Sequence, residues 1–516
     1  MADAATLRPR ELLRFGWTQL TSMRTALTLL FAAALAAIPG SLIPQRPVSP
    51  IQVDQFIADN PQLGGAYDAL GLFEVYTSPW FSAIYLLLMV SLIGCIVPRV
   101  GLYARALRAE PVNTPRNLAR LPAYARVEGA PDALDRAAGQ LRGARYRVRR
   151  IEEPDGASLS AERGYLREAG NLIFHISLVV MLVGIAVGVM FGYKGTAVVP
   201  VGSGFSNTLS QYDEISSGAA FTDRDLRPFS VLVDDFTVRW ETGPVNTGQA
   251  REYTARVRVI DGMDGTPTEK LLEVNRPLEV GGATVHLLGH GYAPRVTVRD
   301  GAGSIAFSGP VVFLPQDTSF TSAGVIKVPD ARPERLAFEG IFVPTTAVDN
   351  AMPQSLFPDA YNPYLFLNAF HGPPRESTGV PENVYSLDRT GLTQYTQPNG
   401  DLLRVKLREG ESFELPDGSG TLTYDGWQRW VRLQVSHSPG LTPVLITLAI
   451  GVTGLCLSLF VRPRRLWVRR RTDGSIEIAG LDRADGRVGL AEAVDELTDS
   501  VLADGDTMAT EKTTAE

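Results

Sequence analysis

The apolar residues of this chain gather into four runs that are nearly free of charge, and polar segments of very different lengths separate these runs. The runs are Ala26–Ile43, Trp80–Val97, Leu172–Phe191 and Leu441–Val461. As a helix, each run is about long enough to cross ~30 Å of hydrocarbon. The pattern predicts a polytopic α-helical membrane protein with four transmembrane helices.

The basic residues are distributed unevenly around these runs. Arg46–Pro79 carries one Lys or Arg, Arg99–Arg167 carries fourteen, and RPRRLWVRRR follows the fourth run. Because short cytoplasmic loops carry the excess of Lys and Arg, we expect both termini in the cytoplasm and the protein in the plasma membrane. The alanine-rich first run also offers weak signal-peptide cleavage sites, but its continuation to Ile43 favours a retained anchor.

These two patterns predict the domain organisation. We expect membrane helices at 26–43, 80–98, 169–192 and 441–461, cytoplasmic segments at 1–25, 99–168 and 462–516, a short extracytoplasmic loop at 44–79 and a large extracytoplasmic domain at 193–440. The last segment is acidic from about Asp473 and shows little periodic apolar signal. We therefore expect most of that tail to be disordered.

The large segment of residues 193–440, before the fourth run, has a residue pattern typical of β-strands. Its short runs are rich in Val, Thr and aromatic residues, and Gly, Asp, Asn or Pro punctuate them. The clearest are Ser230–Trp240, Tyr253–Ile260, Ala283–Leu288, Arg295–Arg299, Arg335–Val343 and Leu402–Leu407. They predict an antiparallel β-sandwich or an open barrel.

The basic connector predicts a small α+β module. It contains a strand, helix, strand, strand order at Ala123–Glu128, Ala133–Gly143, Arg145–Glu152 and Ser158–Arg163. Its arginines either set the orientation beside anionic lipid or recognise an acidic ligand, and the sequence leaves both readings open.

Composition excludes several classes of protein. With 45% hydrophobic and 20% charged residues and a net charge of −7, the chain is not wholly disordered, and its basic residues form no block with interleaved aromatics. Nucleic acid is therefore not an expected partner. Cys95 and Cys456 both lie in apolar runs, so there is no CxxC redox pair, CxxCH haem-attachment site or cysteine zinc framework. GxGxxG, GxxxxGK[ST] and GxSxG motifs are also missing from the sequence.

His175 is the most informative of the five histidines. It lies roughly one turn inside the third run, where an imidazole must find a hydrogen bond or a metal. Two readings stay open: a packing histidine bonded to a neighbouring helix, and an axial ligand or proton relay. If His175 binds haem, it supplies one axial bond and a partner must supply the second.

The other histidines carry weaker signals. His437 precedes the fourth run and is a second candidate ligand, against a capping or solvated role at the membrane face. His286 and His290 are expected to share one face of a strand, which is a weak argument for a metal. His371 is expected in a turn.

Several short motifs, in their order along the chain, resemble one family. They are Leu20–Leu27 (LTSMRTAL), Ile38–Gln45 (IPGSLIPQ), Phe174–Leu178 (FHISL), Val274–Leu278 (VNRPL), Gly289–Tyr292 (GHGY), Ser438–Gly440 (SPG) and Gly454–Phe460 (GLCLSLF). From about residue 14 to about 472 the chain is similar to the ResB (CcsB) proteins of system II cytochrome c biogenesis. The cluster Asp425–Trp430 lacks the WWD pattern of CcsA proteins, which argues for the ResB half alone.

The resemblance implies a partner of the CcsA (ResC) type, in a complex that moves haem b across the membrane and presents it, reduced, to apocytochrome c. His175 matches the family's membrane histidine, which shares a transient haem with a histidine of the partner; the role of His437 stays open. Thioether formation uses the cytochrome's cysteines and the haem vinyl groups, so the resemblance implies a non-catalytic or co-catalytic subunit of a synthase complex. Other proteins would reduce the thiols.

Two other classes of function remain as alternatives. The first is a membrane-anchored receptor or assembly scaffold, whose external β domain binds a peptide or envelope component and whose membrane histidine is structural. The second is an ion- or proton-coupled transporter, which needs several ionisable groups along its spans. His175 is essentially alone in that respect.

Overall fold

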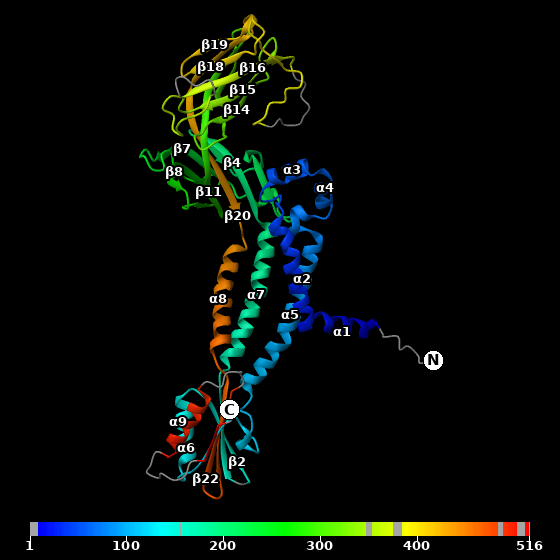
Figure 1. Cartoon of the computed structure of the whole chain (residues 1–516), viewed down its shortest axis with the longest axis vertical. Helices are drawn as coiled ribbons and strands as arrows, with labels where there is room; N and C mark the ends of the chain where they lie inside the picture. Colours follow the sequence, from blue (N-terminus) through cyan, green and yellow to red (C-terminus); the bar gives the residue numbers. More distant parts are fainter. Residues whose placement is uncertain are drawn as a thin grey trace, which may run out of the picture. The chain divides into compact units, whose positions relative to one another are not determined.

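The computed structural model describes residues 9–154, 156–346, 353–374, 384–482, 489–502 and 511–514 (Figure 1). These form two compact units, one of residues 1–186 with 440–516 and one of residues 187–439. We call them the helical unit and the β unit, and each is described by itself.

Four helices of the described residues are long and apolar enough to cross a membrane, which confirms the predicted number. They are α2 (Met23–Leu42), α5 (Pro79–Arg108), α7 (Leu166–Phe191) and α8 (Leu441–Phe460). Helix α5 starts where the Ser78 hydroxyl accepts from the Phe81 amide, and it ends with Arg105 and Arg108, whose charges favour a helix carboxyl end.

Shorter helices precede and follow α2 along the chain. They are α1 (Pro9–Leu20), α3 (Pro50–Asp59), α4 (Pro61–Ala69) and the 3-10 turn η1 (Leu72–Thr77). Arg46 ties the last two together, since its guanidinium lies 2.8 Å from Asp68 and 2.9 Å from Glu74. The short predicted loop between the first two spans is thus a folded element with Phe73 and Val75 in its core.

The helical unit also contains a six-stranded sheet, which we call the sheet module. Its strand order is β2-β3-β21-β22-β1-β23. The elements are β1 (Ala123–Glu128), α6 (Ala133–Gly143), β2 (Arg147–Glu153), β3 (Gly156–Arg163), β21 (Arg464–Arg471), β22 (Ser475–Asp482), α9 (Leu490–Leu502) and β23 (Glu511–Thr514), with the 3-10 turn η2 (Leu118–Arg120). The first four follow the strand, helix, strand, strand order expected of the connector.

The expectation of a mostly disordered tail is wrong for residues 464–482 and 490–502. Strands β21 and β22 lie in the middle of the sheet, and Ile476 and Ile478 of β22 are fully buried. The helical signal in α9 was overlooked because charged residues interrupt it: Leu490, Val494, Leu497 and Val501 recur every three or four residues and are buried. These four side chains join the core that α6 forms with β1, β3, β21 and β22.

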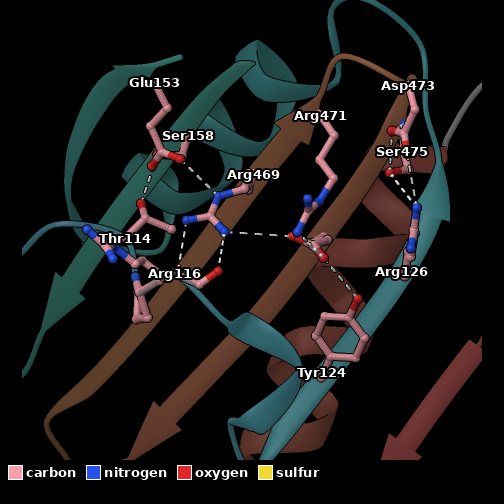
Figure 2. A network of polar contacts seen from close by, with 12 residues as sticks. Thr114, Arg116, Tyr124, Arg126, Glu153, Ser158, Arg469, Arg471, Asp473 and Ser475 are labelled. Carbon is pink, nitrogen blue, oxygen red and sulfur yellow. Dashed lines mark hydrogen bonds and ion pairs between the residues drawn. The ribbon is translucent and has the colours of Figure 1, made fainter. Parts of the chain in front are cut away.

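A belt of polar contacts crosses one face of this module (Figure 2). Arg469 of β21 lies 3.1 Å from Glu153 and donates to the backbone carbonyls of Pro115 and Arg116 at 2.8 and 3.1 Å. The Ser158 hydroxyl donates to Glu153 at 2.7 Å and lies 2.8 Å from the Thr114 hydroxyl. These contacts therefore hold residues 114–116, which follow α5, against strands β3 and β21.

The β unit consists of antiparallel strands in three sheets. One sheet has the order β10-β11-β20-β4-β6 with β12 on β11 and β19 on β20, another β13-β14-β15-β16-β17 with β18 on β16, and the third β5-β7-β8-β9. The strands are β4 (Tyr193–Pro200), β5 (Gly204–Ser206), β6 (Glu214–Ser217), β7 (Phe229–Trp240), β8 (Ala250–Asp261), β9 (Thr268–Glu273), β10 (Leu278–Val280), β11 (Ala283–Asp300), β12 (Ile305–Pro310), β13 (Leu314–Pro315), β14 (Ser322–Val328), β15 (Arg335–Val343), β16 (Tyr364–Gly372), β17 (Thr393–Gln394), β18 (Arg404–Arg408), β19 (Ser412–Glu414) and β20 (Gly420–His437). The 3-10 turns η3 (Leu209–Gln211), η4 (Asp223–Asp225) and η5 (Pro416–Gly418) connect them.

The long pair β11 and β20 runs through two separate cores. One core combines the first half of β11 and the end of β20 with β4, β7 and β8, and the other combines the rest of this pair with β14, β15 and β16. The predicted segments Ala283–Leu288 and Arg295–Arg299 are parts of the single strand β11. The antiparallel β-rich region is as expected, but two cores along one ribbon were not foreseen.

A bulge interrupts β11. Leu287 pairs with Leu433 and Gly289 with Arg432, so Leu288 is an extra residue without a partner across the ladder. Because one inserted residue exchanges the two faces of a strand, His290 lies on the core side with Leu287, whereas His286 lies on the other face. The prediction that His286 and His290 share one face is therefore wrong.

Candidate functional site

Helix α7 packs against α8 through small residues. Gly170, Ser177 and Gly184 recur every seven residues and so lie on one face of α7. A Cβ added at Gly170 would lie 2.5 Å from the Gly454 carbonyl oxygen, and one added at Gly184 would lie 2.8 Å from a Val444 methyl group. Small residues allow such close approach of membrane helices, so this face of α7 is committed to α8.

His175 leaves α7 on a different face, since five residues separate it from Gly170 and place it about 140° around the helix. Its Nδ1 lies 2.7 Å from the Asn171 carbonyl oxygen. A carbonyl oxygen can only accept, so Nδ1 carries a proton, and the neutral ring in this tautomer has its lone pair on Nε2. Within the described residues, nothing is hydrogen-bonded to that Nε2 atom.

This arrangement fits an axial ligand to haem iron. A ligating histidine usually donates its other ring N–H to a carbonyl or carboxylate, which fixes its tautomer and orientation. Helices α2, α5 and α8 contain no histidine, so the chain's membrane helices offer one imidazole. A haem with two histidine ligands therefore needs a second imidazole from outside these helices.

Two tyrosine hydroxyls connect helix α5 to α7 and to the residue just before it. The Tyr85 hydroxyl donates to the Leu182 carbonyl oxygen at 2.5 Å, and the Tyr103 hydroxyl donates to the Tyr165 carbonyl oxygen at 3.2 Å. His175 lies between these two contacts along α7, and Leu182 follows it by seven residues on the same face. Two tyrosines of α5 thus bracket the stretch that carries the histidine.

A cavity of about 530 Å3 lies next to Asn171, one turn before His175. Four arginines line it, at positions 163, 167, 464 and 465, together with Glu110, Glu162 and Glu168. The Tyr165 hydroxyl, also in the wall, donates to Glu162 at 2.5 Å. Burial and this carboxylate raise the pKa of Tyr165 to about 12.

Most charged groups of this cavity have a partner, whereas the side chains of Arg167 and the exposed Glu168 form no ion pair within the described residues. Arg465 lies 2.7 Å from Glu162, and Arg464 lies 2.9 Å from Asp482. The Arg163 guanidinium lies over the Tyr146 ring, and Glu110 binds Arg149 at 2.9 Å. Arg167 is half-buried, and its guanidinium has no ion pair or hydrogen bond with any described residue. Since it precedes His175 by eight residues, its guanidinium is the free cation nearest to that histidine along α7 within the described part of the chain.

His437 ends β20, four residues before α8. Its Nδ1 lies 2.7 Å from the Gly282 carbonyl oxygen, and its ring centre lies 5.8 Å from that of Tyr193. The ring is half-buried and, like His175, donates through Nδ1. His175 and His437 belong to different units, so each is described only in its own surroundings.

The remaining candidates differ from expectation or add little. His371 lies in β16 opposite Leu336, and its Nδ1 bonds Glu334, so the prediction of a turn is wrong. Both cysteines are free thiols. No cluster of three or more His, Cys, Asp or Glu side chains suited to a metal ion occurs in the described ranges.

Sequence reasoning missed Arg167, Asn171 and Tyr85. Arg167 was counted only among the basic residues that set orientation, although its place eight residues before His175 was a usable signal. The Asn171 contribution comes from the backbone, and the Tyr85 contact joins helices far apart in the sequence. Neither of these leaves a pattern in the chain.

Together, these observations describe a protein with four helices suited to span a membrane, of which α7 carries one histidine oriented by its own backbone. The ResB-like family matches residues 23–495, and the chain belongs to this family. It is similar to the "Cytochrome c biogenesis protein CcsB" of Picosynechococcus sp., with 26% identity over 283 residues, 54% of this chain and 58% of the relative. The CcsB of a Nostoc species is 27% identical over 274 residues, 52% of this chain and 56% of the relative. The matches thus span less than two thirds of these curated relatives.

Proposed function

We propose that this protein acts in cytochrome c biogenesis as a haem-binding membrane subunit that works with a CcsA/ResC-type partner. The observation that carries this proposal is the geometry of His175, whose Nδ1 is held by the Asn171 carbonyl while Nε2 stays available. Membership of the ResB-like family and the names of the CcsB relatives support the same role. The partner supplies the opposite axial ligand, and haem passes from this shared site toward apocytochrome c.

In this function haem supplies the iron centre and the vinyl groups that are joined to cytochrome thiols. The chain's own residues bind and orient. His175 holds one axial position, and the α7–α8 contact at Gly170 fixes the rotation of α7 and hence the direction of the imidazole. Arg167, without an ionic partner among the described residues, binds a propionate carboxylate at the cavity beside Asn171. The protein thus acts by placement of groups, as a non-catalytic or co-catalytic subunit.

The topology follows from the charges. The sheet module and both termini lie in the cytoplasm, since the basic segments flank that side, and the β unit lies outside. This places the cavity with Arg167 on the cytoplasmic side, where haem is taken up. The β unit braces the partner and guides the apocytochrome, whose thiols other proteins keep reduced.

The test is the absorption spectrum of the detergent-purified protein, co-expressed with its CcsA-type partner. We expect a haem spectrum for the wild type, its loss in His175→Ala and its recovery when imidazole is added, because free imidazole fills the vacated axial position. Cytochrome c assembly in cells should follow the haem content.

His371→Ala is the matched control, since this histidine lies in β16 against Glu334. It should keep both haem and assembly, and His437→Ala measured beside it decides whether that residue contributes. Unchanged haem and assembly in His175→Ala would contradict the proposal and leave a scaffold with a structural histidine.

A further inference from the structure

Strand β11 carries a second buried histidine that the proposed function does not use. His290 is 7% exposed, and neither of its ring nitrogens has a hydrogen-bond partner among the described residues. Burial, with a smaller effect of the Arg429 guanidinium, lowers the pKa of His290 to about 3. The ring is therefore neutral at physiological pH, with a lone pair that nothing described engages.

Aromatic side chains surround this imidazole. Its ring stacks on Phe320 with 4.6 Å between centres, and Phe236, Tyr253 and Trp240 follow at 5.1, 5.3 and 5.9 Å. The Trp240 Nε1 is also buried without a hydrogen-bond partner in the described chain. Buried polar atoms are normally paired, so three nitrogens in one cage without a partner among the described residues are exceptional.

The cage opens on a cavity of about 760 Å3 with mostly apolar walls. Val274 and Pro277 form one side of it, and Gly289 and His290 form another, so the VNRPL and GHGY motifs meet here. The cavity lies where one edge of β11 has no partner strand. Strand β10 pairs with β11 only as far as Val285, and the next pairing on that edge is the one between Tyr292 and Phe313. The bulge at Leu288 turns His290 toward the core side of this uncovered stretch.

We propose that this cavity in the β unit is a second haem site, with His290 as an axial ligand to the iron. The inference deepens the proposed function and rests on it, since it makes the β unit a place where haem is held after the membrane site. A ring nitrogen of His290 gives its lone pair to iron and displaces a water ligand, and no electron changes place. Aromatic walls stack on the porphyrin, and the Trp240 N–H donates to a haem carboxylate.

Phe320 covers the imidazole in the structure described here. Its φ of +60° is in the left-handed region, which bulky residues rarely adopt, and the Asp317 carboxylate holds the turn by accepting from the Ser319 and Thr321 amides at 2.9 and 3.0 Å. The ring must swing aside before iron reaches His290. Phe320 therefore acts as a lid over the imidazole.

The test is a titration of ferric haem into the full-length His175→Ala protein in detergent, followed by absorption and magnetic circular dichroism. We expect one haem per chain with a histidine-ligated spectrum. His290→Phe, added to the same His175→Ala protein, should bind at least about tenfold more weakly and lose this spectrum. Phenylalanine fits an aromatic cage and removes the unpaired nitrogens, so this variant should stay folded. Phe320→Ala should bind haem faster, because the lid is absent.

His286→Phe is the matched control, since it lies on the opposite face of the same strand at the rim of the cavity. It should leave the spectrum unchanged. Equal binding in the His175→Ala protein with and without His290→Phe would show adventitious haem and overturn the proposal. If His175 binds haem with the partner but this titration shows none, the second site is wrong while the proposed function stands; if neither binds, both are wrong.

Discussion

Two histidines of this chain differ in whether their own backbone forms a hydrogen bond with the imidazole. In helix α7 the carbonyl of Asn171, four residues back, reaches His175 Nδ1 at 2.7 Å. In strand β11 the backbone of His290 pairs with Val431 of β20, and a strand side chain stands away from its own carbonyls. The helix thus sets the tautomer of its histidine, whereas both ring nitrogens of the strand histidine have no hydrogen-bond partner among the described residues.

The largest effect is expected for Gly170→Leu in the α7–α8 contact. A side chain there meets the Gly454 carbonyl oxygen, which cannot rotate away, so we expect a loss of about 3 kcal/mol or more of stability and of haem at His175. Haem content with the partner and thermal unfolding measure both. Gly101→Leu in α5, where an added Cβ meets nothing within 4 Å, should change neither. Haem retention in Gly170→Leu would separate helix packing from ligation.

The next effect is a pH dependence confined to His290. Its pKa is lowered to about 3 in the folded state, from an ordinary value of 6.5, so between these values the unfolded state binds more protons. Stability should therefore be complete above about pH 6.5 and fall as the pH decreases, by about 2 kcal/mol at pH 5.

Denaturant unfolding followed by the emission of Trp240 and the other tryptophans measures this dependence. His290→Phe should remove the dependence and raise stability by about 1–3 kcal/mol, since no unpaired nitrogen stays buried. The same slope in His290→Phe as in the wild type would assign it to other groups. His371→Phe serves as the control.

A smaller effect is expected for Arg167→Gln at the cavity beside Asn171. We expect haem held at His175 to bind about tenfold more weakly, because a charge-assisted bond to a propionate is lost. The dimethyl ester of haem, which lacks the carboxylate charges, should bind the variant and the wild type alike. Arg105→Gln, at the exposed end of α5, is the control. Equal weakening of both ligands would point to a fold defect instead.

The smallest expected effect is that of Tyr85→Phe. It removes the hydrogen bond from α5 to the Leu182 carbonyl of α7, which is worth about 1 kcal/mol. Helix α7 also carries His175. Haem at His175 should weaken by a few-fold, and haem at His290 should not change. Titration of both sites in one preparation checks this. Tyr67→Phe, whose hydroxyl bonds no described residue, should be silent at both.

Sequence periodicity predicted what local rules control. The four apolar runs became α2, α5, α7 and α8, and β15 spans the predicted Arg335–Val343. The module was only half recognised, because β21 pairs with β3 and β22 pairs with β1, both of which lie more than 300 residues earlier in the chain. The local sequence pattern of about ten residues does not indicate which distant strand will pair with it.

The same distinction between local and long-range information applies to the surroundings of His175 and His290. His175 was visible because a lone imidazole in an apolar run is unusual. The cage of His290 was not, since its aromatics come from β7, β8 and the turn at Phe320, and one unpaired residue at Leu288 decides which face the imidazole takes. A one-residue shift of this kind depends on the partner strand, which sequence patterning does not specify.

The central position of β21 and β22 also bears on biosynthesis. β3 and β1 are separated in the sheet by strands that the ribosome makes only after the last membrane helix. Until residue 482 has emerged, the basic connector cannot close its sheet and exposes two strand edges to proteases and chaperones. A nonsense mutation shortly after α8 would thus leave every span intact and still yield a chain that quality control recognises as unfinished.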